Sequence, residues 1–454
     1  MRTITFLFTF LLVLTSTVRA ADRPNIVFII SDDHRFDMIG AAGNTSVHTP
    51  NIDRLAKEGT HFRQATIHVP QCSPCRAMLL TGLPPHQNGH YANQTQRADI
   101  KNADGFKQYP TLPGLLRESG YRTVLVGKWH LIADPWNCGF SDVRVWLPGG
   151  GGEYLDEPKL AKGNSRAKVE MKGFTNDLFG QDAAAFLRGD AANEKPFFLW
   201  VALTAPHTPL APNPPEVQKV YEGKTGQDVW PPTLPKDAHA RRMKDYAEAV
   251  TMADRQVGHI LSALDEQKLA DNTIVVFMGD NGYMMGTREL NKQKAFHGKV
   301  YPYEDSIRVP LVIKAPGAKR PGAGADACVS SLDLPPTLVK LAGATPPANW
   351  VGRDMTPVLM GGDDDTPFAH AVCEFADAEN PKFGDINYRL IRTATHKLID
   401  WADVTRPDEF YDLKADPQEK KNLIGDAPTK DVRDGLRREL RAWMEKTHDP
   451  ALNW

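Results

Sequence analysis

The chain has 454 residues, of which 41% are hydrophobic and 24% are charged, and its formal net charge is −2 at pH 7. These values are ordinary for two or three average domains, or for one large α/β domain with a smaller appendage. They exclude a collagen-like, coiled-coil or wholly disordered chain. Because the sequence has no long basic block, nothing indicates nucleic acid as a partner.

The first 20 residues have the pattern of a secretory signal peptide. Arg2 supplies a positive charge, residues 4–14 form an almost unbroken apolar run, and residues 18–20 end in a small residue suited to cleavage. The run is shorter than the about 20 residues that span a bilayer, so a membrane anchor is the less favoured alternative. We therefore expect an exported protein, periplasmic or secreted, without membrane contact after cleavage.

Four short apolar runs have the length and composition of strands buried on both faces of a sheet. They are residues 25–30, 123–126, 197–203 and 273–278. Helical patterns lie between them: two open at residues 49–51 and 111–113, and a third extends over residues 241–269. This alternation predicts an α/β fold with a mostly parallel sheet sandwiched by helices.

The last quarter of the chain has a different organisation. Residues 346–365 are rich in proline, glycine and aspartate, which is typical of a boundary. Short strand patterns and a helical pattern at residues 431–444 follow, and they predict a small antiparallel sheet plus helix. The expected organisation is a signal peptide at 1–20, a large domain at 21–362 and a C-terminal subdomain at 363–454.

Polar side chains follow each of the four predicted strands. In open α/β sheets, ligands bind outside the carboxyl ends of the strands, so we expect these side chains to meet at one rim. The residues concerned are Asp32, Asp33, Lys128, His130, His207, Asp280 and Asn281.

The acidic members of this set predict a metal site. Asp32 and Asp33 are adjacent, and burial of two neighbouring carboxylates requires a cation. Asp280 and Asn281 add a carboxylate and an amide oxygen, and such an all-oxygen set suits Ca²⁺ or Mg²⁺ better than zinc. Either pair alone would more simply cap a helix, but two pairs at two strand ends favour a metal.

The basic members predict an anion site. Lys128 and His130 are two residues apart after a strand, so in extended geometry they point to the same side. Together with His207, Arg76 and Lys299, they would form a pocket for an anion with several oxygens. Taken singly, each of these residues is more often a solvated or structural one.

The segment Cys72-Ser73-Pro74-Cys75-Arg76, followed by an apolar helical pattern that ends at Thr81-Gly82, resembles the sulfatase signature C-x-P-x-R. Further stretches that resemble the family are residues 24–33, 49–53, 127–130, 205–207, 279–282, 299–310, 411–413, 416–417 and 422–423. From the number and order of these motifs, the chain is identified as a member of the formylglycine-dependent sulfatases, with their alkaline-phosphatase-like fold.

The resemblance implies a mechanism. A separate formylglycine-generating enzyme would oxidise Cys72, and the hydrated aldehyde would attack the sulfur of a sulfate ester. The metal, expected to be Ca²⁺ with Mg²⁺ as the alternative, would be held by Asp32, Asp33, Asp280, Asn281 and position 72.

The resemblance also implies roles for the basic residues. Arg76, Lys128 and Lys299 would offset the negative charge of the sulfate. His207, together with Lys299, would protonate the leaving alcohol, and His130 would assist the release of sulfate.

Two positions depart from the family pattern. Cys75 stands where serine is common, although the shorter C-x-P-x-R core is intact. The family often has a histidine shortly after the Asp-Asn-Gly motif, and here Arg288 and His297 are the candidates for its role. Lys299 is assigned by aligning the family motif backwards from Tyr303-Glu304, not forwards from Asp280.

Other functions are compatible with parts of the pattern. Cys72 and Cys75 have the spacing of a redox motif, but a redox site leaves the aspartate pairs unexplained. A phosphate or phosphonate ester hydrolase would use the same charges, and a catalytically inactive glycan-binding relative would keep the motifs without the modification.

The expected substrate is a sulfated carbohydrate. Residues 81–89, and Trp443 with residues 447–450, resemble heparan sulfamidases, which cleave N-sulfoglucosamine. Lys299 and residues 303–305 resemble O-ester sulfatases instead. O-sulfate cleavage is therefore the first hypothesis, and N-sulfate cleavage is the alternative.

Overall fold

The computed structural model describes residues 23–453 with gaps at 94–95, 152–155, 190–194, 232–239, 286–288, 291–292, 295–297, 320, 363–367 and 378–385. The predicted signal peptide, Arg288 and His297 lie outside the described residues. Among the helices that are described, none is long and apolar enough to cross a membrane.

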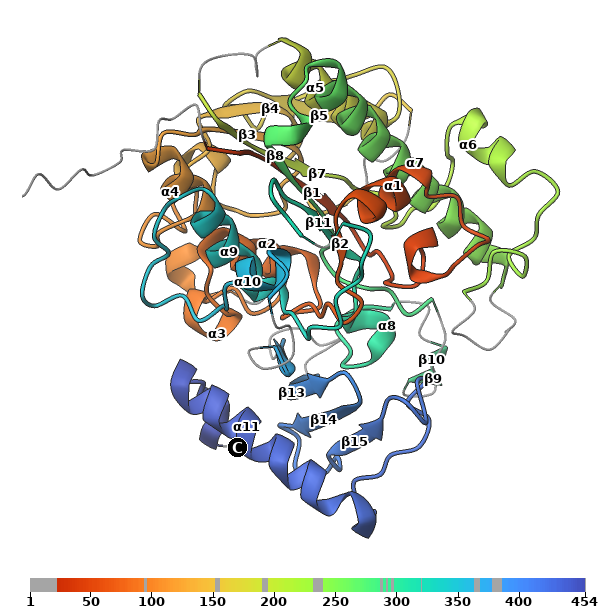
Figure 1. Cartoon of the computed structure of the whole chain (residues 1–454), viewed down its shortest axis with the longest axis vertical. Helices are drawn as coiled ribbons and strands as arrows, with labels where there is room; N and C mark the ends of the chain where they lie inside the picture. The colour runs from red at the N-terminus through yellow and green to blue at the C-terminus, as the bar shows by residue number, and fades with distance from the viewer. Residues whose placement is uncertain are drawn as a thin grey trace, which may run out of the picture.

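A large mixed sheet forms the centre of the molecule (Figure 1). The described part of the chain gives it nine strands, in the order β2-β11-β8-β1-β7-β3-β4-β5-β6. The five central strands run parallel: β8 (Thr273–Gly279), β1 (Asn25–Ser31), β7 (Phe197–Ala202), β3 (Arg122–Lys128) and β4 (Asp142–Leu147). Antiparallel pairings add β11 (Leu311–Lys314) and β2 (Thr60–His61) at one edge, and β5 (Lys159–Lys162) and β6 (Lys168–Glu170) at the other.

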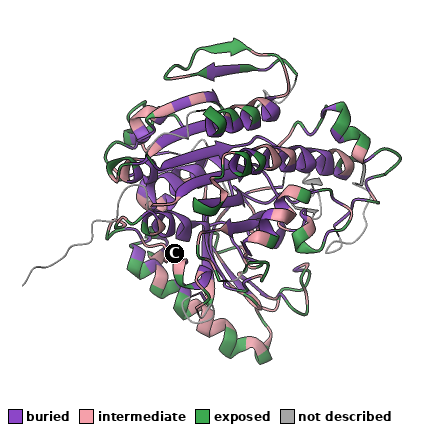
Figure 2. Cartoon of the chain, turned by 45° about the horizontal axis from the view of Figure 1, so that its top comes forward, coloured by how far each residue is buried: buried purple, intermediate pink, exposed green. Residues whose placement is uncertain are grey.

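Helices cover both faces of this sheet, because alternate residues of each central strand point to opposite sides. In β1, Val27 and Ile29 pack in the hydrophobic core with α1 (Pro50–Glu58), α5 (Thr175–Gly189) and α7 (Ala240–Glu266). Ile26, Phe28 and Ile30 pack in the core on the other face, with α2 (Cys72–Thr81), α4 (Leu112–Glu118) and α9 (Leu334–Leu341). The central strands and the inner helix faces are accordingly buried in Figure 2.

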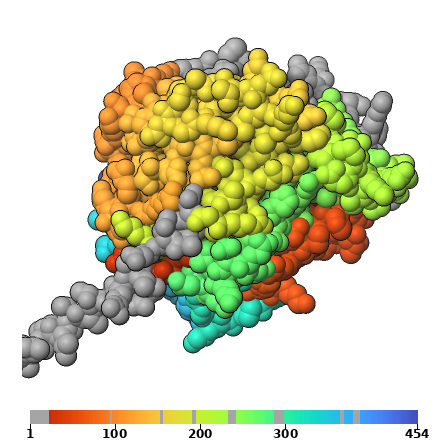
Figure 3. Space-filling model, turned by 90° about the horizontal axis from the view of Figure 1, so that it is seen from above, coloured from red at the N-terminus to blue at the C-terminus, as the bar shows by residue number. Residues whose placement is uncertain are grey.

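Short elements and connecting loops complete the large domain. The short elements are the helices α3 (Pro85–Asn88), α6 (Pro215–Val220), α8 (Glu304–Ile307) and α10 (Thr356–Leu359) and the strands β9 (Glu289–Leu290) and β10 (Gln293–Lys294). Seen from above, the yellow segment with β5 and α5 lies beside the green segment with α7, and the two cover much of this face (Figure 3).

The C-terminal part forms a second, smaller sheet. Its antiparallel strands are β12 (His370–Ala376), β13 (Asn387–Thr393), β14 (His396–Trp401) and β15 (Glu409–Asp412). Leu398 packs with Leu440 of α11 (Lys430–Thr447) on one face, while Leu390 and Ile399 belong to the core of the large domain on the other. The predicted α/β fold with a small C-terminal antiparallel sheet plus helix is thus confirmed.

Candidate active site

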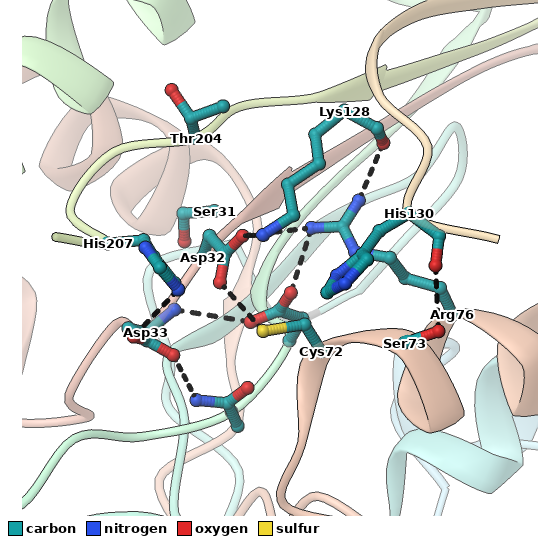
Figure 4. A network of polar contacts seen from close by, with 12 residues as sticks. Ser31, Asp32, Asp33, Cys72, Ser73, Arg76, Lys128, His130, Thr204 and His207 are labelled. Atoms are coloured by element: carbon teal, nitrogen blue, oxygen red, sulfur yellow. Dashed lines mark hydrogen bonds and ion pairs between the residues drawn. The ribbon is translucent and has the colours of Figure 1, made fainter. Parts of the chain in front are cut away.

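Four neighbouring parallel strands, β8, β1, β7 and β3, are followed by polar residues at their carboxyl-terminal ends. These ends lie together along one edge of the sheet, as shown in Figure 4. Asp32 and Asp33 follow β1, Asp280 and Asn281 follow β8, His207 lies in the loop after β7, and Lys128 and His130 lie at the end of β3. Backbone contacts fix these ends: Asp280 N donates to Ser31 O (2.9 Å), and Asp32 N donates to Ala205 O (3.2 Å). All sequence-predicted strand-end residues therefore lie in one region.

Cys72 faces this edge from the first position of α2, which is buried along its whole length. Its Sγ donates to Asp32 Oδ1 at 3.2 Å and lies 2.8 Å from Lys299 Nζ. Burial, reinforced by the negative charge of Asp32, raises the pKa of the Cys72 thiol well above its ordinary range. Because a reactive thiol needs a lowered pKa, an unmodified Cys72 is poorly suited to redox chemistry.

Three basic side chains contact the three carboxylates. Arg76 donates from its guanidinium to Asp280 Oδ2 and to Lys128 O, both at 2.8 Å. Lys128 Nζ forms an ion pair with Asp32, and Lys299 Nζ forms one with Asp33 at 2.8 Å. Each carboxylate therefore has at least one basic partner.

The carboxylates nevertheless differ in their ionisation. Burial opposes the charged form of Asp32, but Lys128 and the other nearby cations hold its pKa below the usual range. Burial and the negative charge of Asp32 raise the pKa of Asp280 to about 7. Two of these carboxylates thus repel each other strongly in the absence of further positive charge.

Both histidines of the site have a lowered pKa, which favours their neutral forms. Burial, followed by the charge of Lys299, lowers the pKa of His207, and burial with Lys128 lowers that of His130 further. His207 Nδ1 is 2.6 Å from Thr208 O, to which it donates, and its Nε2 lies 3.7 Å from Asp33 Oδ2. His130 has a left-handed backbone with φ of 60°.

The oxygen donors fit a hard divalent cation. Asp32 and Asp33 each offer a carboxylate oxygen, and these two atoms, the Cys72 sulfur and a His207 ring nitrogen lie within 4.8 Å of one another. Asn281 Oδ1 is buried without a hydrogen-bond partner among the described residues, while its Nδ2 donates to Asp33. A cation would satisfy this amide oxygen and reduce the repulsion between the carboxylates.

Sequence reasoning missed Tyr246 as part of the site. Its hydroxyl donates to Asp33 O at 2.5 Å and accepts from Arg35 N at 2.9 Å, which supports the left-handed turn at Asp33 (φ 59°). Tyr246 fits the apolar face of α7 equally well, so no local signal in the sequence distinguishes this role.

Comparisons with known proteins agree with this geometry. The sulfatase family model matches residues 24–344, and the model of the C-terminal part of N-sulphoglucosamine sulphohydrolase matches residues 293–446. An ulvan-active sulfatase from Formosa agariphila is 30% identical, over 93% of this chain and 81% of that protein. An N-acetylglucosamine-6-O-sulfatase from Bacteroides thetaiotaomicron is 27% identical, over 89% of this chain and 83% of that protein.

A solved structure shows a similar fold with a sugar bound. It is a complex with its substrate D-glucosamine-2-N,6-O-disulfate, has a TM-score of 0.78 and 25% identity, and the match covers 94% of this chain and 99% of that chain. Since the family model covers most of the chain, the protein belongs to the sulfatase family, whose members are sulfuric ester hydrolases.

Proposed function

We propose that this protein releases sulfate from a sulfated carbohydrate by means of a formylglycine formed from Cys72 and a bound divalent cation. The observation that carries the proposal is the position of Cys72, which contacts both Asp32 and Lys299 at the buried start of α2. Relatives named for ulvan and for N-acetylglucosamine 6-sulfate support a carbohydrate substrate.

The cation would be held by Asp32, Asp33, Asp280, Asn281 and position 72. Their oxygen donors favour Ca²⁺, with Mg²⁺ as the alternative. When bound, the cation would supply Lewis-acid polarisation of the sulfate oxygens. Formylglycine would supply, as its hydrate, a hydroxyl nucleophile at position 72.

The basic side chains would bind and orient the sulfate group. Arg76 and Lys128 are fully buried, so their charges act in a medium of low dielectric constant and are poorly screened. Burial opposes the charge of Lys299, but Asp33 raises its pKa well above the ordinary value, so Lys299 stays protonated. Together with the bound divalent cation, these three basic side chains would outweigh the charge of the carboxylates and attract the sulfate anion.

Proton transfers would fall to the two histidines. The His207 side chain is 18% exposed and its Nε2 lies beside Asp33. Because Nδ1–H is held by Thr208 O, His207 would first take up a second proton at Nε2 and then deliver it to the leaving alcohol, with Lys299 as a second donor. His130 is held neutral and can accept a proton when sulfate departs.

Two further proposals concern processing. Residues 1–20 would direct export to the periplasm or the exterior and then be removed, and a formylglycine-generating enzyme would modify Cys72 during maturation.

Residues 21–362 would form the catalytic domain, and residues 363–454 would form the C-terminal subdomain.

Sulfate release from defined sugars tests the function. The protein, co-expressed with a formylglycine-generating enzyme, is assayed with glucosamine 6-O-sulfate, N-sulfoglucosamine and a phosphonate monoester, and the peptide containing residue 72 is examined by mass spectrometry. We expect O-sulfate release, a mass consistent with formylglycine, and loss of activity in Cys72→Ala but not in Cys138→Ala, which removes another buried thiol.

The remaining outcomes separate the alternatives. Release from N-sulfoglucosamine alone would favour a sulfamidase, which the match to the sulphohydrolase C-terminal model supports. A preference for the phosphonate ester, or sulfate release by Cys72→Ala, would overturn the proposed function.

A further inference from the structure

Ser73 and His90 form a hydrogen-bonded chain that ends on the backbone of His130. Ser73 Oγ lies 2.7 Å from His130 O and 2.7 Å from His90 Nε2. Ser73 and His90 are 2% and 1% exposed, so water does not compete for these contacts. Neither residue belongs to the proposed catalytic or metal-binding set.

The direction of each hydrogen bond follows from the number of protons. A serine hydroxyl has one proton and a carbonyl oxygen only accepts, so Ser73 donates to His130 O. Ser73 Oγ must therefore accept from His90 Nε2–H. Burial lowers the pKa of His90 to about 3, so the ring is neutral and Nδ1 carries no proton. In agreement, Nδ1 is buried without a partner among the described residues.

His130 needs such support because its own backbone is strained. Its φ of 60° is a conformation that residues with a Cβ rarely adopt unless their surroundings hold them. The Nδ1 side of its ring is not anchored, since this atom is buried without a hydrogen-bond partner in the described structure. Gly150 packs so closely that a Cβ there would lie 2.0 Å from His130 Nε2. The ring therefore contacts the backbone of residue 150, while the carbonyl is held by Ser73.

The first turns of α2 hold both ends of the segment formed by residues 128–130. Ser73 and Arg76 are three residues apart on the helix, so they lie on the same face. Arg76 donates to Lys128 O, and Ser73 donates to His130 O. The helix that presents Cys72 thus also fixes the backbone that presents Lys128 and His130.

We propose that His90 and Ser73 are positioning residues that hold the His130 imidazole beside position 72 through this hydrogen-bonded chain. This inference rests on the proposed role of His130 and deepens it. The alternative is that His90 only fills space, because its ring also stacks against Phe106 at a centroid distance of 6.3 Å.

Matched substitutions separate the two roles. His90→Phe keeps the ring volume without the N–H, and Ser73→Ala removes the hydroxyl, whereas His90→Gln and Ser73→Thr keep a donor and a hydroxyl. We expect the first pair to lower kcat about 10- to 100-fold with little change in KM, and the second pair to retain most of kcat. The double variant Ser73→Ala/His90→Phe should be no slower than Ser73→Ala, because both changes break one chain.

A measurement that needs no activity completes the test. Imidazole ¹⁵N chemical shifts should show His90 protonated at Nε2 and not at Nδ1, and the His130 ring signals should shift in Ser73→Ala. An Nδ1–H tautomer, unchanged kcat in both His90→Phe and Ser73→Ala, or equal losses in all four single variants would overturn the proposal. Absence of sulfate release by the wild type would overturn the proposed function instead, and the tautomer would still test the chain.

Discussion

Lys299 Nζ lies 2.8 Å from Cys72 Sγ, although the two residues are 227 positions apart in the sequence. The same ammonium group lies 2.8 Å from Asp33 Oδ1. One cation therefore contacts both the position of the proposed nucleophile and a proposed metal ligand. No predicted strand leads directly to Lys299, which distinguishes it from the strand-end residues around it.

Substitution of Lys299 tests this contact. Lys299→Met should lower kcat/KM for sulfate release about 10²- to 10³-fold, the usual effect of removing one preorganised group that stabilises developing negative charge. Steady-state kinetics on the modified protein measure the loss. Lys314→Met is the control, because Lys314 of β11 pairs with Glu58 of α1 and its loss should leave kcat/KM within about twofold. Equal activity of Lys299→Met and wild type would contradict the assigned role.

Removal of divalent cations should lower both activity and thermal stability. A ligand that binds only the folded state stabilises it by about 2.7 kcal/mol at 100 times its Kd. We expect EDTA to abolish sulfate release and lower Tm, and Ca²⁺ to restore both.

Two aspartate variants show whether the effect arises at the proposed site. Asp280→Asn should lose most of the Tm response to Ca²⁺, because it removes one buried carboxylate. Asp326→Asn, at an exposed pair with Arg63, should respond like the wild type. A Tm that is insensitive to EDTA and Ca²⁺ would contradict a metal at this edge.

Arg76 should matter for stability as well as for catalysis. It is 1% exposed and pairs with Asp280, which is fully buried. Removing one partner of a buried ion pair typically costs about 3–5 kcal/mol, because the other charge remains buried. Arg76→Ala should therefore lower the free energy of unfolding by about that amount in urea titrations, whereas Arg63→Ala should cost less than about 1 kcal/mol. Similar losses of unfolding free energy in both variants would show that the buried ion pair contributes no more to stability than the exposed one.

The sequence predicted the site wherever strand ends determine it. Asp32, Lys128 and Asp280 follow continuous apolar runs, and the parallel sheet then brings them together. Lys299 follows no such run, and only its resemblance to the family motif pointed to it. Tyr246 could not be found at all, because a core tyrosine and one that supports Asp33 have the same sequence pattern.

The missed helix α5 illustrates a second limit. Its segment contains Gly180 and a run of alanines, which weaken the apolar periodicity. These small residues allow close packing: a Cβ at Gly180 would lie 2.2 Å from the side chain of Gln256 in α7. The feature that obscures the helix in the sequence is thus the one that its packing requires.

A buried ion pair joins α3 to the small C-terminal sheet and should respond to pH. His86 Nδ1 lies 2.7 Å from Glu374 Oε2 of β12, Asp449 and Arg389 lie next to the pair, and His68 interacts electrostatically with both partners. Burial alone would lower the pKa of His86, but Glu374 raises it above 6.5. Because the folded-state pKa is raised, protonated His86 stabilises the fold fully below pH 6.5. This stabilisation is lost as pH rises through the folded-state value.

Differences in Tm between variants isolate this contribution. Histidines away from this pair titrate alike in wild type and variant, so we compare wild type with His86→Gln at each pH. Because His68 interacts with both His86 and Glu374, the comparison is repeated in a His68→Gln background. The Tm difference should be largest near pH 6 and should shrink as pH rises above neutrality. His48→Gln, at an exposed position, should show no such trend, and Glu374→Gln should show the same trend as His86→Gln. A Tm difference for His86→Gln that grows with pH would reverse the sign of the linkage and rule out a protonated His86 in the folded state.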